Sequence, residues 1–134
     1  MKNQTLTGMR DNDFYRACCR ELARAADAGT PYANARALVR ATIHRPAPHF
    51  YISYRYAMKC PRNAGYKTKR QMWADFEATV AALEARHSIP RHDAVLRALI
   101  DMPAPRFYFS VKNGERIFSR IRHAKAAKAA KSNP

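Results

Sequence analysis

The sequence predicts an all-α protein made of two tandem three-helix repeats, packed as a pseudo-symmetric pair and followed by a basic C-terminal tail. One pattern occurs twice, as PAPHFYIS at 46–53 and PAPRFYFS at 103–110, an offset of 57 residues. Laid over 74–112 without a gap, 17–55 gives 13 identities in 39 positions. Apolar residues also recur at helical spacing before each motif. A fixed internal period indicates one structural unit used twice.

The repeat divides the chain into five segments. These are a flexible N-terminus at 1–12, the first repeat at 13–61, a basic connector at 62–70, the second repeat at 71–122 and an Ala/Lys tail at 123–134. At 134 residues the chain suits one compact domain or two small halves that share a core. The tail has lysines among alanines and little apolar surface, so we expect it to be frayed when free and helical when its lysines meet phosphates.

Three helices are expected in the first repeat, at 14–28, 33–44 and 54–60. Asp11 or Asp13 can cap the first of them, and Ser53 can cap the third. The second helix must end before Pro46, because a residue that precedes proline is pushed out of the helical region. The motif between the second and third helices is therefore extended or turning.

The second repeat follows the same order. Its helices are expected at 71–86, at 91–101 and from 111 into the tail, with Ser110 as the cap of the third. Gly114 should weaken the first turn of that last helix by about 1 kcal/mol relative to alanine. The large apolar residues at helical spacing and in the motifs should form the core, namely Phe14, Leu38, Phe50, Trp73, Phe76, Leu99 and Phe107.

The formal net charge is +15, and it is unevenly distributed. No acidic residue lies between Ala28 and Ala74, and Glu115 is the only acidic residue from Met102 to the end. The segments before each of these stretches are close to neutral. A high positive charge gathered in this way favours a polyanionic partner.

Other classes of protein are less compatible with the sequence. Cys18, Cys19 and Cys60 do not form a disulfide framework, and no signal peptide or apolar run of membrane-spanning length is visible. We therefore expect a reduced, soluble, cytoplasmic protein, associated with a nucleoid or a particle as a further option. A zinc site from His44, His49 and Cys60 has no counterpart in the second repeat, so no metal is expected. No catalytic constellation or cofactor motif is present, so neither an enzyme nor a cofactor is expected.

Each motif is expected to have two faces. Phe50 and Phe107 would fill the core, while Tyr51 and Tyr108 would point outward, where their hydroxyls could meet phosphates. A capped helix that follows another through a rigid turn is similar to helix-turn-helix DNA-binding modules. The third helix of each repeat would then read the groove, with Tyr54, Arg55, Tyr56 and Lys59 in one and Lys112, Asn113 and Arg116 in the other.

The predicted function is binding of nucleic acid, preferably duplex DNA, through backbone phosphates, in a regulatory or architectural role. The predicted contact residues are Arg36, Arg40, Tyr51, Arg55, Lys59, Lys67, Lys69, Arg70, Arg106, Tyr108, Lys112, Arg116, Arg120, Arg122, Lys125 and Lys128. Two alternatives stay open, a structural component of a nucleoprotein or virus particle and an RNA-binding protein whose tyrosines stack on bases. The sequence leaves open whether the chain forms a homodimer.

Overall fold

A computed structural model describes residues 5–59 and 69–132, and this part of the chain is all-helical, as predicted. The helices are α1 (Leu6–Asp27), α2 (Ala35–Ile43), α3 (Tyr54–Lys59), α4 (Arg70–His87), α5 (Arg91–Asp101) and α6 (Val111–Ser132). Two linkers join helices through the repeated motifs, at 44–53 between α2 and α3 and at 102–110 between α5 and α6.

The helix caps explain most of these boundaries. The Ser53 hydroxyl accepts a hydrogen bond from the Tyr56 N–H at 3.1 Å, and Ser110 accepts one from Asn113 N–H at the same distance, so both predicted caps are confirmed. At the start of α2, the cap is Asn34, whose side chain accepts from the Ala37 N–H at 2.9 Å. An asparagine at this position satisfies one of the free N–H groups of the first turn.

The first helix starts earlier than predicted. Thr5 is its N-cap and accepts a hydrogen bond from the Gly8 N–H at 2.9 Å, so the prediction that 1–12 is flexible is wrong from residue 5 onward. The two predicted caps, Asp11 and Asp13, both lie inside this helix, so neither is its cap, and Asp11 is buried. A carboxylate is buried here because two arginines, Arg10 and Arg120, bind it.

At the other end of the chain, α6 continues to Ser132. The expectation that 123–134 is frayed in the free protein therefore fails for 123–132. Alanine and lysine both favour helix, and the helix is already nucleated by its packed N-terminal half.

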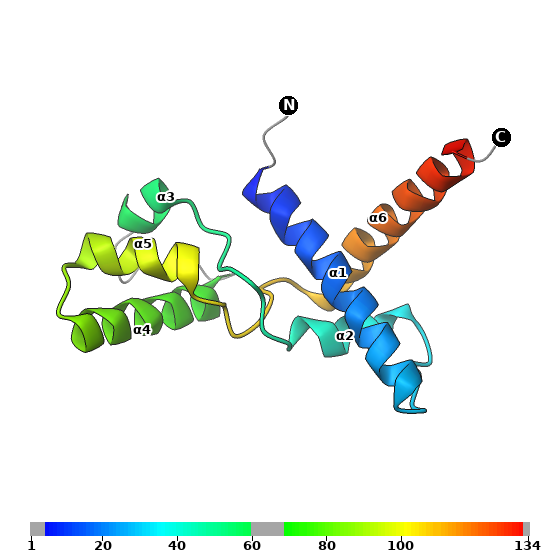
Figure 1. Ribbon diagram of the computed structural model, residues 1–134, viewed down its shortest axis with the longest axis horizontal. Helices are drawn as coiled ribbons and strands as arrows, with labels where there is room; N and C mark the ends of the chain where they lie inside the picture. Colours follow the sequence, from blue (N-terminus) through cyan, green and yellow to red (C-terminus); the bar gives the residue numbers. More distant parts are fainter. Residues whose placement is uncertain (1–4, 60–68, 133–134) are drawn as a thin grey trace.

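The helices form two bundles, and the third helix of each predicted repeat packs against helices of the other repeat; this is the exchange of third helices. In the first bundle α6 packs on α1 and α2, and in the second bundle α3 packs on α5, which packs on α4. Figure 1 shows α1, α2 and α6 on one side and α3, α4 and α5 on the other, with the two linkers passing between them. Each linker thus carries the chain from one bundle to the other.

This packing differs from the division into 13–61 and 71–122. Among the described residues, α2 does not pack against α3, and α5 does not pack against α6. The predicted helix-turn-helix pairs each third helix with the second helix of its own repeat, across the motif, and neither α2 with α3 nor α5 with α6 makes that contact. The reason lies in the motifs, because their prolines keep each linker extended and direct it away from the helix that it follows.

The linkers cross at the alanine of each motif. Ala47 and Ala104 exchange both backbone hydrogen bonds, N–H to C=O, at 2.9 Å each, and both residues are buried. The Phe107 N–H also donates to the Ile43 carbonyl at the end of α2, at 3.0 Å. Alanine suits this crossing because both side chains are buried, and a larger one would have to displace the surrounding core.

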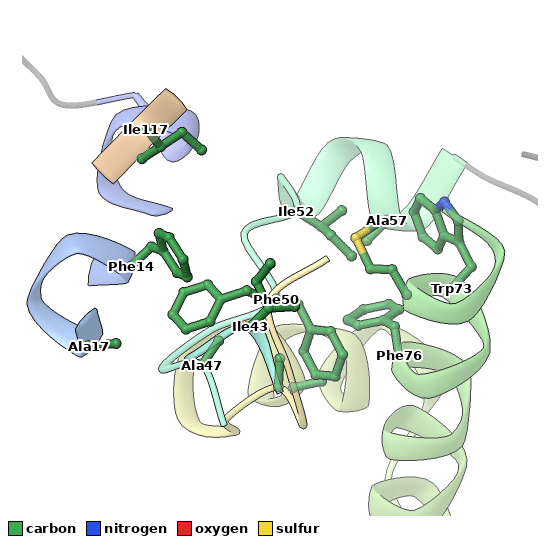
Figure 2. Packing of buried hydrophobic residues seen from close by; sticks show 14 of the residues in the cluster. Phe14, Ala17, Ile43, Ala47, Phe50, Ile52, Ala57, Trp73, Phe76 and Ile117 are labelled. Carbon is green, nitrogen blue, oxygen red and sulfur yellow. The ribbon is translucent and has the colours of Figure 1, made fainter. Parts of the chain in front are cut away.

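A continuous aromatic core runs through the crossing. Phe50 packs on Phe76 of α4 with ring centroids 5.3 Å apart, and Phe107 packs on Phe14 of α1 at 5.0 Å. Phe50 of the first linker therefore lies in the core of the second bundle, and Phe107 of the second linker lies in the core of the first bundle. Figure 2 shows the row from Phe14 past Phe50 to Phe76 and Trp73. Of the seven predicted core residues, all are buried except Leu99, which is partly exposed.

Candidate nucleic-acid interface

The helix α6 carries the largest net positive charge of the described helices. Between Val111 and Ser132 it has seven basic residues and one acidic residue, Glu115. Side chains 122–131 are all exposed, and the C-terminal end of α6 projects away from both bundles (Figure 1). In the part of the chain that the structure describes, this half of the helix therefore offers an exposed basic surface.

The exchange of third helices also gathers charge in one bundle. The helices α1, α2 and α6 carry 13 basic and five acidic residues, a formal charge of +8. The helices α3, α4 and α5 carry six basic and five acidic residues, a formal charge of +1. The charge does not follow the repeat evenly, because the basic α6 belongs to the bundle of α1 and α2.

Several carboxylates of the basic bundle are bound by its own arginines. Asp11 accepts from Arg10 Nη2 at 2.9 Å and from Arg120 Nη2 at 2.7 Å. Glu115 accepts from Arg36 Nε at 2.9 Å. These ion pairs hold α6 against α1 and α2. They also reduce the repulsion that these carboxylates would exert on a bound polyanion.

A groove with basic walls runs between α1 and α6. Arg10 of α1 faces Arg116 and Arg120 of α6 across a hollow of about 380 Å³. A second hollow along the same two helices is lined by Lys125 and Lys128. The Lys125 ammonium lies 5.7 Å from the centre of the Tyr15 ring, so the lysine stem covers α1 while its charge faces solvent.

The structure brings some of the predicted contact residues together and separates others. Six of them lie exposed on α6, namely Lys112, Arg116, Arg120, Arg122, Lys125 and Lys128. Arg36 and Arg40 are exposed on α2 of the same bundle, and Arg55 is exposed on α3 of the other bundle. Lys69 and Arg70 are exposed at the start of α4. Lys59 ends α3, and Lys67 lies outside the described residues.

The prediction that the motif tyrosines face outward is wrong. The Tyr51 hydroxyl donates to Asp13 Oδ2 at 2.6 Å, and the Tyr108 hydroxyl donates to Asp75 Oδ2 at 2.6 Å. Burial and the bonded carboxylate raise the pKa of both tyrosines above the usual value. These hydroxyls join the linkers to α1 and α4, so they are not available to phosphates.

Sequence reasoning missed Arg10 and His49. Arg10 was assigned to the flexible N-terminus, whereas Thr5 caps a helix that begins at Leu6 and includes Arg10. His49 occupies the motif position of Arg106, 57 residues earlier, and both line one hollow at the linker crossing. The two positions are polar in both copies of the motif, but only Arg106 was predicted as a contact residue.

Neither a metal-binding cluster nor a membrane-spanning helix occurs within the described ranges of the chain. Within 5–59 and 69–132, no three His, Cys, Asp or Glu side chains are grouped so that they could hold a metal ion. Cys60, considered with His44 and His49 as a zinc ligand, is outside these ranges. None of the described helices has both the length and the apolar character needed to cross a bilayer.

Comparison of the chain with protein families, with curated proteins and with solved structures finds no match in any of the three.

Proposed function

We propose that the protein binds nucleic acid, preferably duplex DNA, with α6 as the main contact element. The observation that carries this proposal is the exposed C-terminal half of α6, which projects from a bundle of formal charge +8. Lysine and arginine bind nucleic acids by neutralising phosphates and releasing counterions. The lysines at 125, 128 and 131 lie among alanines, whose small side chains let the helix approach a surface closely.

The shape of the basic element favours duplex DNA over duplex RNA. The major groove of B-form DNA is about 12 Å wide and admits an α-helix. The major groove of A-form RNA is deep and narrow, so side chains cannot read it. A projecting helix therefore matches the DNA groove better.

Binding by this surface would depend little on sequence. Lysine and arginine dominate the exposed side of α6, whereas the amide of Asn113, the kind of group that reads adenine, accepts a bond from Arg116 Nη2 at 2.5 Å. Contacts to phosphates fix position and orientation without specifying bases. An architectural role thus agrees better with these side chains than a site-specific regulator.

The tyrosines bear on the RNA alternative. Stacking on unpaired bases needs aromatic rings that are open to solvent. Tyr51 and Tyr108 are held against aspartates, while Tyr54 and Tyr56 on α3 are each 42% exposed. Among the described tyrosines, the exposed rings thus lie on the nearly neutral bundle, away from the basic helix, which favours the duplex proposal; Tyr66 lies outside the described residues.

We also propose that the two bundles derive from one repeated unit and are related by an approximate twofold axis, with the end of α6 as a basic tail. The reciprocal bonds of Ala47 and Ala104, which occupy the same motif position, support this relation. So do the Tyr51–Asp13 and Tyr108–Asp75 bonds. The two aspartates are 62 residues apart, five more than the motifs, so the first helices correspond only if the ungapped alignment is opened by five residues.

A titration over salt concentration tests the α6 proposal. Full-length protein would be titrated against duplex DNA, single-stranded DNA and structured RNA by fluorescence anisotropy. Log affinity for duplex should fall steeply with log salt, and Lys125→Gln with Lys128→Gln should reduce the slope by about two units. Arg86→Gln with Arg97→Gln removes the same charge from exposed positions on α4 and α5, and should leave the slope within about half a unit.

Three results would count against the proposal. Equal loss in the two double variants would show that only net charge matters. A preference for single strands would favour the RNA-type alternative. Weak binding of all three nucleic acids near physiological salt would exclude a phosphate-binding surface on α6.

A further inference from the structure

The crossing of the two linkers contains a second basic cluster, separate from the exposed end of α6. Arg10 of α1, Lys69 at the start of α4, His49 of the first linker and Arg106 of the second line one hollow. None of the described residues that line it is acidic. Arg10 already binds Asp11, so Lys69 and Arg106 supply the charge that is not engaged by that carboxylate.

Arg106 has an unmet hydrogen-bonding requirement at this hollow. Its Nε atom is buried and has no hydrogen-bond partner among the described residues. A buried guanidinium N–H without an acceptor is unfavourable, because the group has lost its water and gained nothing in return. Arg106 therefore brings to the lining of the hollow a guanidinium whose Nε has no partner among the described residues.

The size and charge of the hollow indicate what could bind there. Its volume of about 30 Å³ is enough for roughly one water-sized atom, and too small for a nucleobase. Cationic side chains reach it from α1, from the start of α4 and from the second linker. Donors that converge from several directions suit a group with several charged oxygens, of which one enters the hollow while the others stay at its mouth.

We propose that the linker crossing binds one phosphate group, held by the basic side chains that line the hollow, Arg106, Lys69 and Arg10. Arg10 also lines the groove between α1 and α6, so this hollow and the groove share a wall. The phosphate could therefore belong to a polynucleotide that lies along the groove or to a free phosphorylated molecule. The site does not depend on α6 binding nucleic acid.

The first arm of the test uses inorganic phosphate as the probe. Isothermal titration of the full-length protein in a dilute chloride buffer should show saturable binding in the millimolar range. Arg106→Met, which keeps much of the apolar stem, should weaken this binding by about tenfold. Arg106→Lys should also weaken it, because an ammonium cannot offer the paired planar donors with which a guanidinium binds phosphate. Arg97→Met removes an exposed arginine of α5 and should bind phosphate as the wild type does.

The effect of phosphate on the melting temperature provides a second measurement of binding. Phosphate should raise the melting temperature of the wild type and of Arg97→Met, and should not raise that of Arg106→Met. If Arg106→Met does not fold, Lys69→Met provides the same comparison from an exposed position. Absence of saturable phosphate binding, or equal binding by Arg106→Met and Arg97→Met, would overturn the proposal.

The second arm identifies the source of the phosphate. Duplex DNA that displaces bound phosphate from the wild type assigns the site to the nucleic-acid backbone, whereas phosphate that stays bound beside DNA assigns it to a small phosphorylated molecule. The variant Lys125→Gln with Lys128→Gln should bind inorganic phosphate normally. Failure of the α6 proposal and failure of this site would therefore be distinguished.

Discussion

Substitution of Gly114 by alanine tests how closely α6 packs on α2. A Cβ atom added to Gly114 would lie 2.7 Å from Val39 Cγ1, 3.2 Å from Phe109 Cε1 and 3.4 Å from Phe14 Cε2. The first of these distances is far shorter than a van der Waals contact. Val39 is fully buried, and its β-branched side chain has little rotameric freedom in a helix. The added methyl group therefore forces α6 away from α2 or strains the core.

Two effects of Gly114→Ala oppose each other. Alanine is better than glycine in a helix by about 1 kcal/mol. Inserting a methyl group into a packed core costs about 1–3 kcal/mol. Because the closest contact is 2.7 Å and Val39 cannot rotate away, we take the upper half of that range. The variant should lose about 1–2 kcal/mol of unfolding free energy, or roughly 4–6 °C in melting temperature.

Urea and thermal denaturation followed by circular dichroism measure this change. Ala126→Gly, on the exposed part of α6, shows the helix-propensity effect alone. In a double-mutant cycle, Gly114→Ala should be less harmful when combined with Val39→Ala, because the new methyl group enters the space that valine leaves. If Gly114→Ala instead raises the melting temperature, propensity decides the outcome, α6 does not approach α2 this closely, and the exchange of third helices is wrong.

The remaining predictions concern buried titratable groups. In a Cys60→Ser background the exposed Cys19 should react rapidly with a thiol reagent, while Cys18, whose pKa burial raises to about 12, should react only on unfolding. Because the pKa of Tyr108 is raised by burial and by its bond to Asp75, this tyrosine stabilises the fold below pH 10, and the urea midpoint should fall as pH rises above that value. The pKa of Glu21 is lowered to about 2 by its bonds from Arg24, Tyr32 and Arg45, so its contribution is complete above about pH 4.5 and lost as pH falls toward 2. In the variant Glu21→Gln, the urea midpoint should depend less on pH over that acid range. An unchanged dependence of the midpoint on pH would contradict this role.

Local patterns in the sequence predicted most of the helices. Apolar spacing located α5 at its observed bounds, and the Ser53 and Ser110 caps depend on residues within one helical turn. The start of α1 was missed, because the burial of Asp11 depends on Arg120, 109 residues away. Such a long-range partner leaves no mark in the periodicity of the first ten residues.

The partner of each third helix could not be read from the pattern either. The apolar face of α3 or α6 is the same whether the helix returns to its own repeat or crosses to the other one. Only the direction of the extended linkers decides between the two, and the Ala47–Ala104 bonds fix that direction. The orientation of Tyr51 was missed for a related reason, because its positive φ of 59° breaks the simple alternation of an extended strand.

The exchanged helices set the order in which the protein can fold during synthesis. Domains usually fold one after another from the N-terminus as the ribosome extends the chain. Here α1 and α2 emerge first but lack α6, which follows all the other described helices in the chain. The bundle of α3, α4 and α5 is complete earlier. The nascent chain therefore keeps the apolar faces of α1 and α2 uncovered until α6 has been synthesised, and the arrival of α6 completes both the core of that bundle and its basic surface.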